Sequence, residues 1–407
     1  MTDAHAAYPE SILIGLGNTE APGSPNLVFD AIRHIASLGH SAADRWLGWP
    51  LRKHLDSPIP DDIIQLLVDR ARHSPSPEED HWSRDDADSG MVGDRIETNG
   101  INSARGECAR MLGDILVHDA DGHRTGLVTP ELHYLASDPS VAVRSCVAHL
   151  ITACLRHARP AALEAFALLT QADDRLLATR HVADLIVYIG HTDAAVVEPV
   201  IQRMLDSDSA EVRKVGGQLA GLAGLEWRLN DLLATARDAQ HPAAREGVAS
   251  TCAHRLPFTS DPDTASATLQ LLANDPDEKV RAAVAEVAGA LRGQALGPFR
   301  DVLVALIDSP SFEPAVDQLL ITLERAPDRI DDLAILCAQR FVGVFGTDMG
   351  NLSTRAAGNA DEVGRLILRA YEQARTPASR SEVLDLIDML LRFGAYRVDE
   401  LVNAAER

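Results

Sequence analysis

Arginine recurs along the middle of this chain at nearly constant spacing, each time among small and branched apolar residues. The anchors of this pattern are Arg105, Arg144, Thr179, Arg213, Arg245 and Arg281, where Thr179 departs from the rule and Arg180 beside it can substitute. Successive anchors are 39, 35, 34, 32 and 36 residues apart. A period of that size with helical content in each unit is typical of an α-solenoid. We therefore predict an all-α fold, built as an α-solenoid of helix pairs, which mainly presents a surface for binding.

Composition and charge narrow the class of partner. The chain is 46% apolar and only 4% aromatic, which suits closely packed helices better than a β-sandwich. Its 60 acidic and 38 basic residues give a formal net charge of −22. The phosphates of nucleic acid repel a chain with this charge, because nucleic-acid affinity comes largely from cationic contacts. We expect a protein partner and disfavour nucleic acid.

The location of the chain is predicted from what its sequence lacks. Its five cysteines include no C-x-x-C pair, so buried thiols in a reducing compartment are favoured over disulfides or zinc. The first residues do not resemble a signal peptide. No apolar run approaches the length of a membrane span. These features predict a cytoplasmic protein without a membrane segment.

Four regions follow from the pattern along the chain. Residues 1–72 form degenerate helical pairs after a loop-like stretch at 1–26, and residues 73–98 form an acidic, mobile insertion. The insertion carries eight acids and two arginines, which favours a spacer over a binding loop. Residues 99–292 hold six repeats, and residues 293–407 hold degenerate helical repeats.

Each anchor is expected early in the second helix of a pair. Six residues before the anchors stand Asn99, Asp138, Asp173, Ser207, Ala239 and Asp275. Five of these six side chains are good helix N-caps, because their oxygen can accept a free amide of the first turn. We therefore predict that the second helices begin there.

Two segments carry a resemblance to HEAT repeats: Asp138-Pro139 followed by Val143-Arg144, and Asp275-Pro276 followed by Val280-Arg281. The resemblance implies that aspartate and arginine form a structural ladder, in which each guanidinium meets an acidic group of the adjoining repeat. The residues assigned to this ladder are Arg105, Arg144, Arg213, Arg245, Arg281, Asp138 and Asp275.

A looser resemblance covers more of the chain. Residues 100–106, 352–358, 368–371 and 385–400 are similar to segments in the C-terminal helical arrays of bacterial STAND-type NTPases. The resemblance implies a sensor of a ligand, often a phage component. The chain has no G-x-x-x-x-G-K-[ST] motif, so the ATPase core of that family is absent from it.

No motif in the sequence supports catalysis. Gly15 and Gly17 resemble the start of a dinucleotide fingerprint, but Glu20 replaces its third glycine and Pro22 interrupts the helix that a phosphate needs. The cluster of His118, Asp119, Asp121 and His123 reads as a polar turn rather than a metal site. Cys146 and His149 share a helix face, where a packed thiol is the expected state. We expect no enzyme, no metal and no cofactor.

One column of residues is polar in every repeat. Five residues after the anchors stand Arg110, His149, Asp184, Gln218, Ser250 and Glu286. The stacked second helices of a solenoid usually line its concave side. We assign binding to Arg110, His149, Asp184, Gln218 and Glu286, with plain solvation as an equal alternative.

The sequence therefore predicts a non-catalytic HEAT-repeat sensor or scaffold that binds a partner macromolecule. The alternative is a nucleic-acid enzyme on a HEAT solenoid, like the alkyl-purine DNA glycosylases, which needs a basic groove with aromatics and a carboxylate. A passive assembly scaffold is a third possibility.

Overall fold

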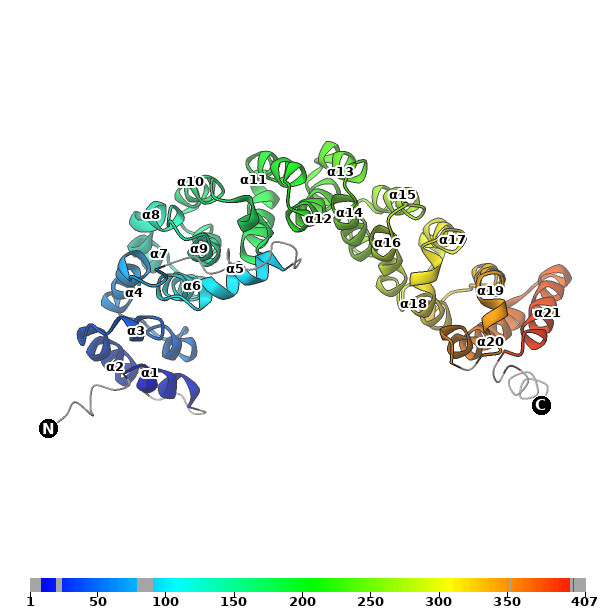
Figure 1. Ribbon diagram of the computed structural model, residues 1–407, viewed down its shortest axis with the longest axis horizontal. Helices are drawn as coiled ribbons and strands as arrows, with labels where there is room; N and C mark the ends of the chain where they lie inside the picture. Colours follow the sequence, from blue (N-terminus) through cyan, green and yellow to red (C-terminus); the bar gives the residue numbers. More distant parts are fainter. Residues whose placement is uncertain (1–8, 20–23, 79–90, 352, 396–397, 399–407) are drawn as a thin grey trace. The chain divides into compact units, whose positions relative to one another are not determined.

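The structure, a computed structural model, describes residues 9–19, 24–78, 91–351, 353–395 and 398 (Figure 1). Within these ranges every regular element is an α- or 3-10 helix, and no strand is present. The chain therefore has the predicted all-α class. It divides into two compact units, residues 1–216 and 217–407, and the boundary falls inside α12 (Ala210–Trp227). No helix in the described ranges is both long and apolar enough to cross a membrane.

In the first unit, helices that are not consecutive in the chain pack on one another. α4 packs mainly on α6, α6 on α9 and α9 on α11, while α4 also contacts α7, and α8 packs on α10. Alternate helices of the chain thus lie side by side in this unit. The helices are α1 (Pro9–Asn18), α2 (Pro25–Ser37), α3 (Ser41–Asp44), η1 (Trp49–Lys53), α4 (Asp61–His73), α5 (Val92–Ile101), α6 (Ala104–Val117), α7 (His123–Val128), η3 (Thr129–Glu131), α8 (Leu132–Ala136), α9 (Val141–Cys154), α10 (Arg159–Leu169), η4 (Asp174–Ala178) and α11 (Arg180–Asp206).

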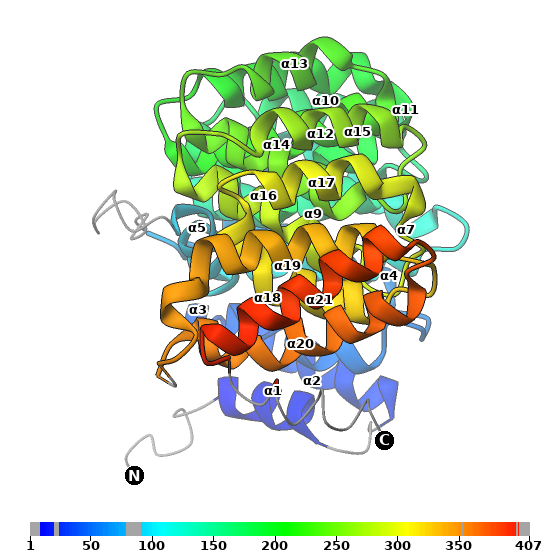
Figure 2. The ribbon, with the colours of Figure 1, turned by 90° about the vertical axis from the view of Figure 1, so that its right-hand side faces the viewer.

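The second unit repeats this arrangement. α14, α16, α18 and α20 pack in succession, as do α15, α17, α19 and α21. Figure 2 shows α17, α19 and α21 one below another. After α12, the helices are α13 (Asn230–Arg237), α14 (Pro242–Arg255), α15 (Pro262–Leu272), α16 (Glu278–Ala290), η5 (Gly297–Phe299), α17 (Arg300–Asp308), α18 (Phe312–Arg325), α19 (Asp331–Phe345), η6 (Gly346–Asp348), α20 (Arg355–Gln373) and α21 (Pro377–Arg392).

The arginine anchors lie in the first turns of helices, as predicted. They occupy α6, α9, α12, α14 and α16, and Thr179 immediately precedes α11. α11 is two helices that meet at Asp193, whose φ of −128° and ψ of 56° break the helical geometry. Its first part therefore holds the third anchor position, and its second part precedes α12.

The predicted N-caps of five second helices are wrong by two or more residues. Ser140 caps α9 and Asp277 caps α16, while Asn99 lies inside α5. The side chains of Asp138 and Asp275 accept instead from the amides two residues later, at 2.8 and 2.9 Å. Ser207 likewise accepts from the amide of Ser209, at 3.3 Å, and α12 begins at the following residue. Asp173 caps the 3-10 helix η4, not α11. The side chains of Asp138, Asp275 and Ser207 therefore close the turn before a helix and do not cap the helix itself.

The arginine ladder is present at two steps. Arg105 binds both carboxylate oxygens of Asp138, at 2.9 and 3.2 Å, and Arg245 binds those of Asp275, at 2.6 and 3.0 Å. Each acid belongs to the next helix pair along the chain, as the HEAT resemblance implies. Bidentate pairing of this kind requires arginine rather than lysine.

The prediction that Arg144 and Arg281 contact an adjacent repeat is wrong. Arg144 donates to the carbonyl of Asp138 at 2.5 Å, and Arg281 donates to the carbonyl of Asp275 at 2.9 Å. Arg213 does the same with Ser207. These arginines fold back onto the turn that precedes their own helix.

At two of the missing steps, the next repeat offers no free acid. Asp173, which would follow Arg144 in the ladder, is bound by Arg175 at 2.9 Å. Ala239, which would follow Arg213, has no acceptor in its side chain.

Two segments that the sequence predicts to be irregular contain helices. Residues 9–18 form α1, in which Gly17 allows the indole of Trp49 to approach: a Cβ built on Gly17 would lie 2.0 Å from Trp49 Cδ1. The loop prediction for this stretch is therefore wrong. The end of the predicted insertion forms α5, with Val92 and Ile96 buried. Residues 79–90 of the insertion lie outside the described residues.

α5 is fixed to three later elements. A Cβ on Gly100 would lie 2.3 Å from the carbonyl oxygen of Ala142 at the start of α9. Glu97 accepts from the amide of His181 at 2.9 Å, and Glu211 accepts from the amides of Val92 and Gly93 at 2.7 and 3.0 Å. The end of the predicted spacer is thus a packed part of the first unit.

The cysteines are packed inside the helical layers, as expected. Cys108, Cys146, Cys154, Cys252 and Cys337 are all buried with free thiols. Burial raises the pKa of the Cys146 thiol to about 12, so this thiol stays protonated near neutral pH and the pairing with His149 does not activate it.

Candidate functional site

The predicted polar column lies on the second helices and none of its members is buried. Arg110, His149 and Asp184 belong to α6, α9 and α11 of the first unit. Gln218 and Glu286 belong to α12 and α16 of the second unit, with Ser250 on α14. The column is thus divided between the two units, and each part forms its own surface.

In the first unit, Arg110 is held by two acids. Its guanidinium donates to both oxygens of Glu107, at 2.8 and 2.8 Å, and to Asp114 at 2.8 Å. Arg52 binds Glu107 as well, at 3.0 Å. The side chain of Glu107 is only 5% exposed, so the two arginines neutralise a nearly buried carboxylate. Arg110 therefore has a structural partner that the sequence did not reveal.

The same chain of contacts continues to a histidine pair. His149 Nε2 lies 2.9 Å from Asp114, and the rings of His149 and His181 are 5.4 Å apart. Burial works against the charged form of Asp114, but the contacts with His149 and Arg110 outweigh it and lower the pKa of this carboxyl. Burial lowers the pKa of His181, whose Nδ1 lies 3.2 Å from the carbonyl oxygen of Ser145.

A cavity of about 500 Å³ opens beside this pair. Its lining includes His149, His181, Asp184, Tyr188 and Arg156, together with apolar side chains of α6 and α9. The side chain of Tyr188 is 60% exposed. Aromatic rings exposed beside charged groups are typical of protein-binding surfaces. The structure thus brings the predicted residues His149 and Asp184 to one cavity.

The column in the second unit makes lighter contacts. Ser250 donates to Glu286 at 2.8 Å, and His254 lies 3.4 Å from the same carboxylate. The main-chain carbonyl of Gln218 accepts from Thr251 at 3.0 Å, which leaves the Gln218 side chain out of that contact. Glu286 is exposed and can meet a partner directly.

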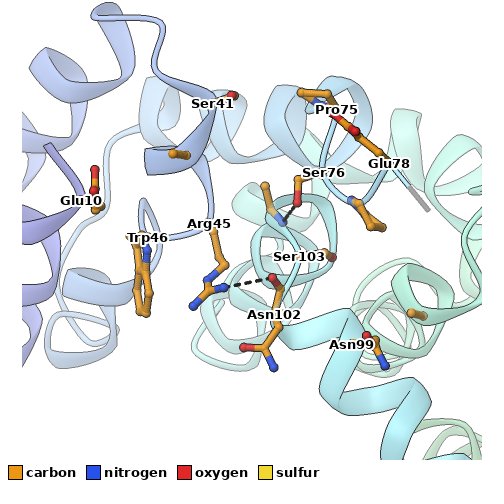
Figure 3. A pocket seen from close by; sticks show the side chains of 14 residues that line it. Glu10, Ser41, Arg45, Trp46, Pro75, Ser76, Glu78, Asn99, Asn102 and Ser103 are labelled. Atoms are coloured by element: carbon orange, nitrogen blue, oxygen red, sulfur yellow. Dashed lines mark hydrogen bonds between the residues drawn. The ribbon is translucent and has the colours of Figure 1, made fainter. Parts of the chain in front are cut away.

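A larger pocket was missed by the sequence reasoning. It has a volume of about 700 Å³ and lies between α1, α3, α5 and the segment before α6 (Figure 3). Arg45, Trp46, Asn99 and Asn102 line it. The signal available in the sequence was the pairing of two tryptophans with two arginines in residues 45–52, but nothing in the repeat pattern places them beside residues 99–102.

The histidine and aspartate cluster at 118–123 is a structural turn, as expected. Asp119 is buried and accepts from the amide and hydroxyl of Thr125, at 2.8 and 2.7 Å. Gly122 has a φ of +83°, which glycine adopts without strain. His118 and His123 each pair with an aspartate of the segment before or within α4. In the described part of the chain, no group of three or more His, Cys, Asp or Glu side chains could hold a metal ion.

Comparison with known proteins adds little. No protein-family model matches the chain, and no curated protein matches it. A crystal structure of an engineered protein is similar over 98% of this chain and 99% of that one, at 12% identity and a TM-score of 0.39. A likeness at that score supports no conclusion about fold or function.

Proposed function

We propose that this chain is a non-catalytic α-solenoid of HEAT-like helix pairs that binds a partner protein on the face of its second helices. It acts as a sensor or scaffold in the cytoplasm and needs no cofactor. The packing of alternate helices against one another within each unit supports the solenoid. The sequence resemblance to the arrays of STAND-type NTPases supports a sensor linked to such a defence system.

The observation that carries this proposal is the accessibility of the polar column. Asp184 and Glu286 are exposed, although Leu185, Ala285 and Val287 beside them in the sequence are buried. Exposure to water accounts for polar side chains at these positions. It does not account for a cavity beside them. In the first unit the column borders the 500 Å³ cavity with the exposed Tyr188, which favours recognition over plain solvation.

The test compares charge reversal on the two kinds of helix. A partner is first isolated from source cells by cross-linking to the purified chain. Asp184→Lys and Glu286→Lys should then weaken its binding about tenfold or more. Glu164→Lys on α10 and Asp263→Lys on α15 are matched controls, because both acids are exposed on first helices. If the controls lose binding and the test variants retain it, the partner binds the first helices instead.

One observation favours the alternative class, an enzyme acting on alkylated DNA. Trp46, Trp49, Arg52 and Glu107 line a smaller pocket of about 250 Å³, which supplies aromatics, a cation and a carboxylate. Against it, both oxygens of Glu107 are already bound by arginines, so this carboxylate has little capacity to accept a proton. Release of a modified base from an alkylated duplex by the purified chain, abolished in Glu107→Gln, would establish the enzyme.

A further inference from the structure

The 700 Å³ pocket of the first unit lies apart from the polar column and has a distinct chemistry. It is formed where α3 meets α5 and the start of α6, with Glu10 of α1 and Glu78 at its edge (Figure 3). We infer that this pocket receives a cationic side chain, an arginine or a lysine, from a basic segment of the partner. The inference rests on the proposed function in one respect, that the partner is a protein.

Trp46 forms an aromatic wall of this pocket. Trp46 is half-buried and is set at 85° to Trp49, with ring centroids 5.8 Å apart. The guanidinium carbon of Arg45 lies 4.4 Å from the centroid of the Trp46 ring. An indole face attracts cations, and arginine most often. The chain itself therefore places a guanidinium on this ring, which identifies the kind of group that the wall accepts.

The polar groups around the wall are mostly hydrogen-bond acceptors. The carboxylates of Glu10 and Glu78 line the pocket, and neither has an ion-pair partner among the residues that the structure describes. Asn99 uses its Nδ2 to donate to the carbonyl of Arg95 at 2.9 Å, which leaves its Oδ1 as an acceptor. The lining thus offers acceptors to an incoming donor.

The lining of the pocket disfavours an anion. Arg45 is the one cation of the described lining, and it donates to the carbonyl of Asn102 at 3.3 Å. The first amides of α6 are also occupied: Arg105 N donates to Ser76 O at 3.0 Å, and Gly106 N donates to Ser103 Oγ at 3.0 Å. The helix N-terminus therefore has few free donors for a phosphate or carboxylate.

The net charge of the whole chain also favours a basic partner. A net charge of −22 attracts a basic partner over long range and speeds its association, and it repels an acidic one. The long-range field brings a basic segment to the protein, and the Trp46 pocket then selects one side chain of that segment.

The experiment uses the full chain and a hexa-arginine peptide, followed by tryptophan fluorescence and calorimetry. The wild type should bind this peptide, bind hexalysine more weakly and not bind hexaglutamate. Trp46→Leu should weaken binding by roughly threefold to thirtyfold, the range for a cation on an indole face. Trp46→Phe keeps an aromatic wall and should lose less, which separates the role of the ring from a loss of folding.

Two further variants separate the pocket from general charge attraction. The pair Glu10→Gln and Glu78→Gln should weaken binding several-fold more than the matched pair Glu313→Gln and Glu382→Gln, which lie exposed on α18 and α21. Arg45→Ala should strengthen binding, because it removes the internal cation from the ring.

Three results would overturn the inference: equal losses in the two glutamate pairs, weaker binding in Arg45→Ala, or no binding of hexa-arginine to the wild type. None of them would affect the proposal for the second-helix face, which is tested separately with the whole partner through Asp184→Lys and Glu286→Lys.

Discussion

Arg245 and Asp275 form a two-point ion pair between successive helix pairs of the second unit. Arg245 Nε lies 2.6 Å from Asp275 Oδ2, and Nη2 lies 3.0 Å from Oδ1. The aspartate side chain is 5% exposed, and its carboxylate also accepts from the amide of Asp277 at 2.9 Å. One acid therefore closes its own turn and holds the preceding helix, so that the two repeats are fixed in register.

Replacing Arg245 by alanine should lower the free energy of unfolding by about 1–3 kcal/mol, because it leaves a nearly buried carboxylate without its cation. Arg281→Ala is the matched control. Arg281 occupies the same helical position but donates only to the carbonyls of Asp275 and Pro276, so it should cost less. Urea unfolding of both variants checks this, and a larger loss in Arg281→Ala would contradict the ladder.

The ion pair of Arg245 and Asp275 also predicts how the stability of the fold depends on acid pH. Burial opposes the charged form of Asp275, but the hydrogen bonds from Arg245 and the amide of Asp277, together with the charges of Arg245 and Arg281, outweigh it and lower the pKa of this carboxyl. A group with a lowered folded-state pKa stabilises the fold above its unfolded pKa of about 3.9, and this stability is lost as pH falls through the folded pKa. Asp275→Asn should therefore lose less stability than the wild type below about pH 4. Equal losses of stability at acid pH in the wild type and Asp275→Asn would show that the ion pair does not cause the loss.

His181 predicts a second, separate effect of pH. Burial disfavours its imidazolium and lowers its pKa. The unfolded chain then binds a proton more readily than the folded one, so stability falls as pH drops below the unfolded value of about 6.5. Melting temperatures between pH 7 and pH 5 should fall further for the wild type than for His181→Gln. His254→Gln, at an exposed histidine, should follow the wild type.

The packing of α5 predicts the effect of a single methyl group. A Cβ at Gly100 would meet the carbonyl oxygen of Ala142 at 2.3 Å and Cys146 Sγ at 2.8 Å, so Gly100→Ala should destabilise the fold by about 1–3 kcal/mol through overpacking. Gly358 lies inside α20, where an added methyl group would meet no atom within 4 Å. Gly358→Ala should stabilise by about 0.5–1 kcal/mol. A neutral Gly100→Ala would mean that α5 does not pack closely on α9.

The sequence predicted the helices well where one residue type recurs in one setting. Arg144, Arg213, Arg245 and Arg281 all lie in the first turn of a helix, where their side chains reach back to the preceding turn. This local geometry repeats with the period of the pattern, so the pattern could be recognised without knowledge of the contacts.

The remaining features depend on contacts that no spacing encodes. α1 carries two glycines among its apolar residues, so that it resembles a strand followed by a loop, and Trp49 packs against its Gly17. The pocket around Trp46 joins α3 to residues 99–102, more than fifty positions away. The column at Arg110 and His149 was found from the sequence, but its link through Glu107 and Asp114 was not, because those acids stand outside the repeated position.

We propose that a partner protein binds the face of the second helices. Hydrogen–deuterium exchange with and without the isolated partner tests it most directly. We predict that binding slows exchange in α9, α11, α14 and α16, around His149, Asp184 and Glu286, and leaves α10 and α15 unchanged. Protection confined to α10, α15 and the other first helices would contradict the claim.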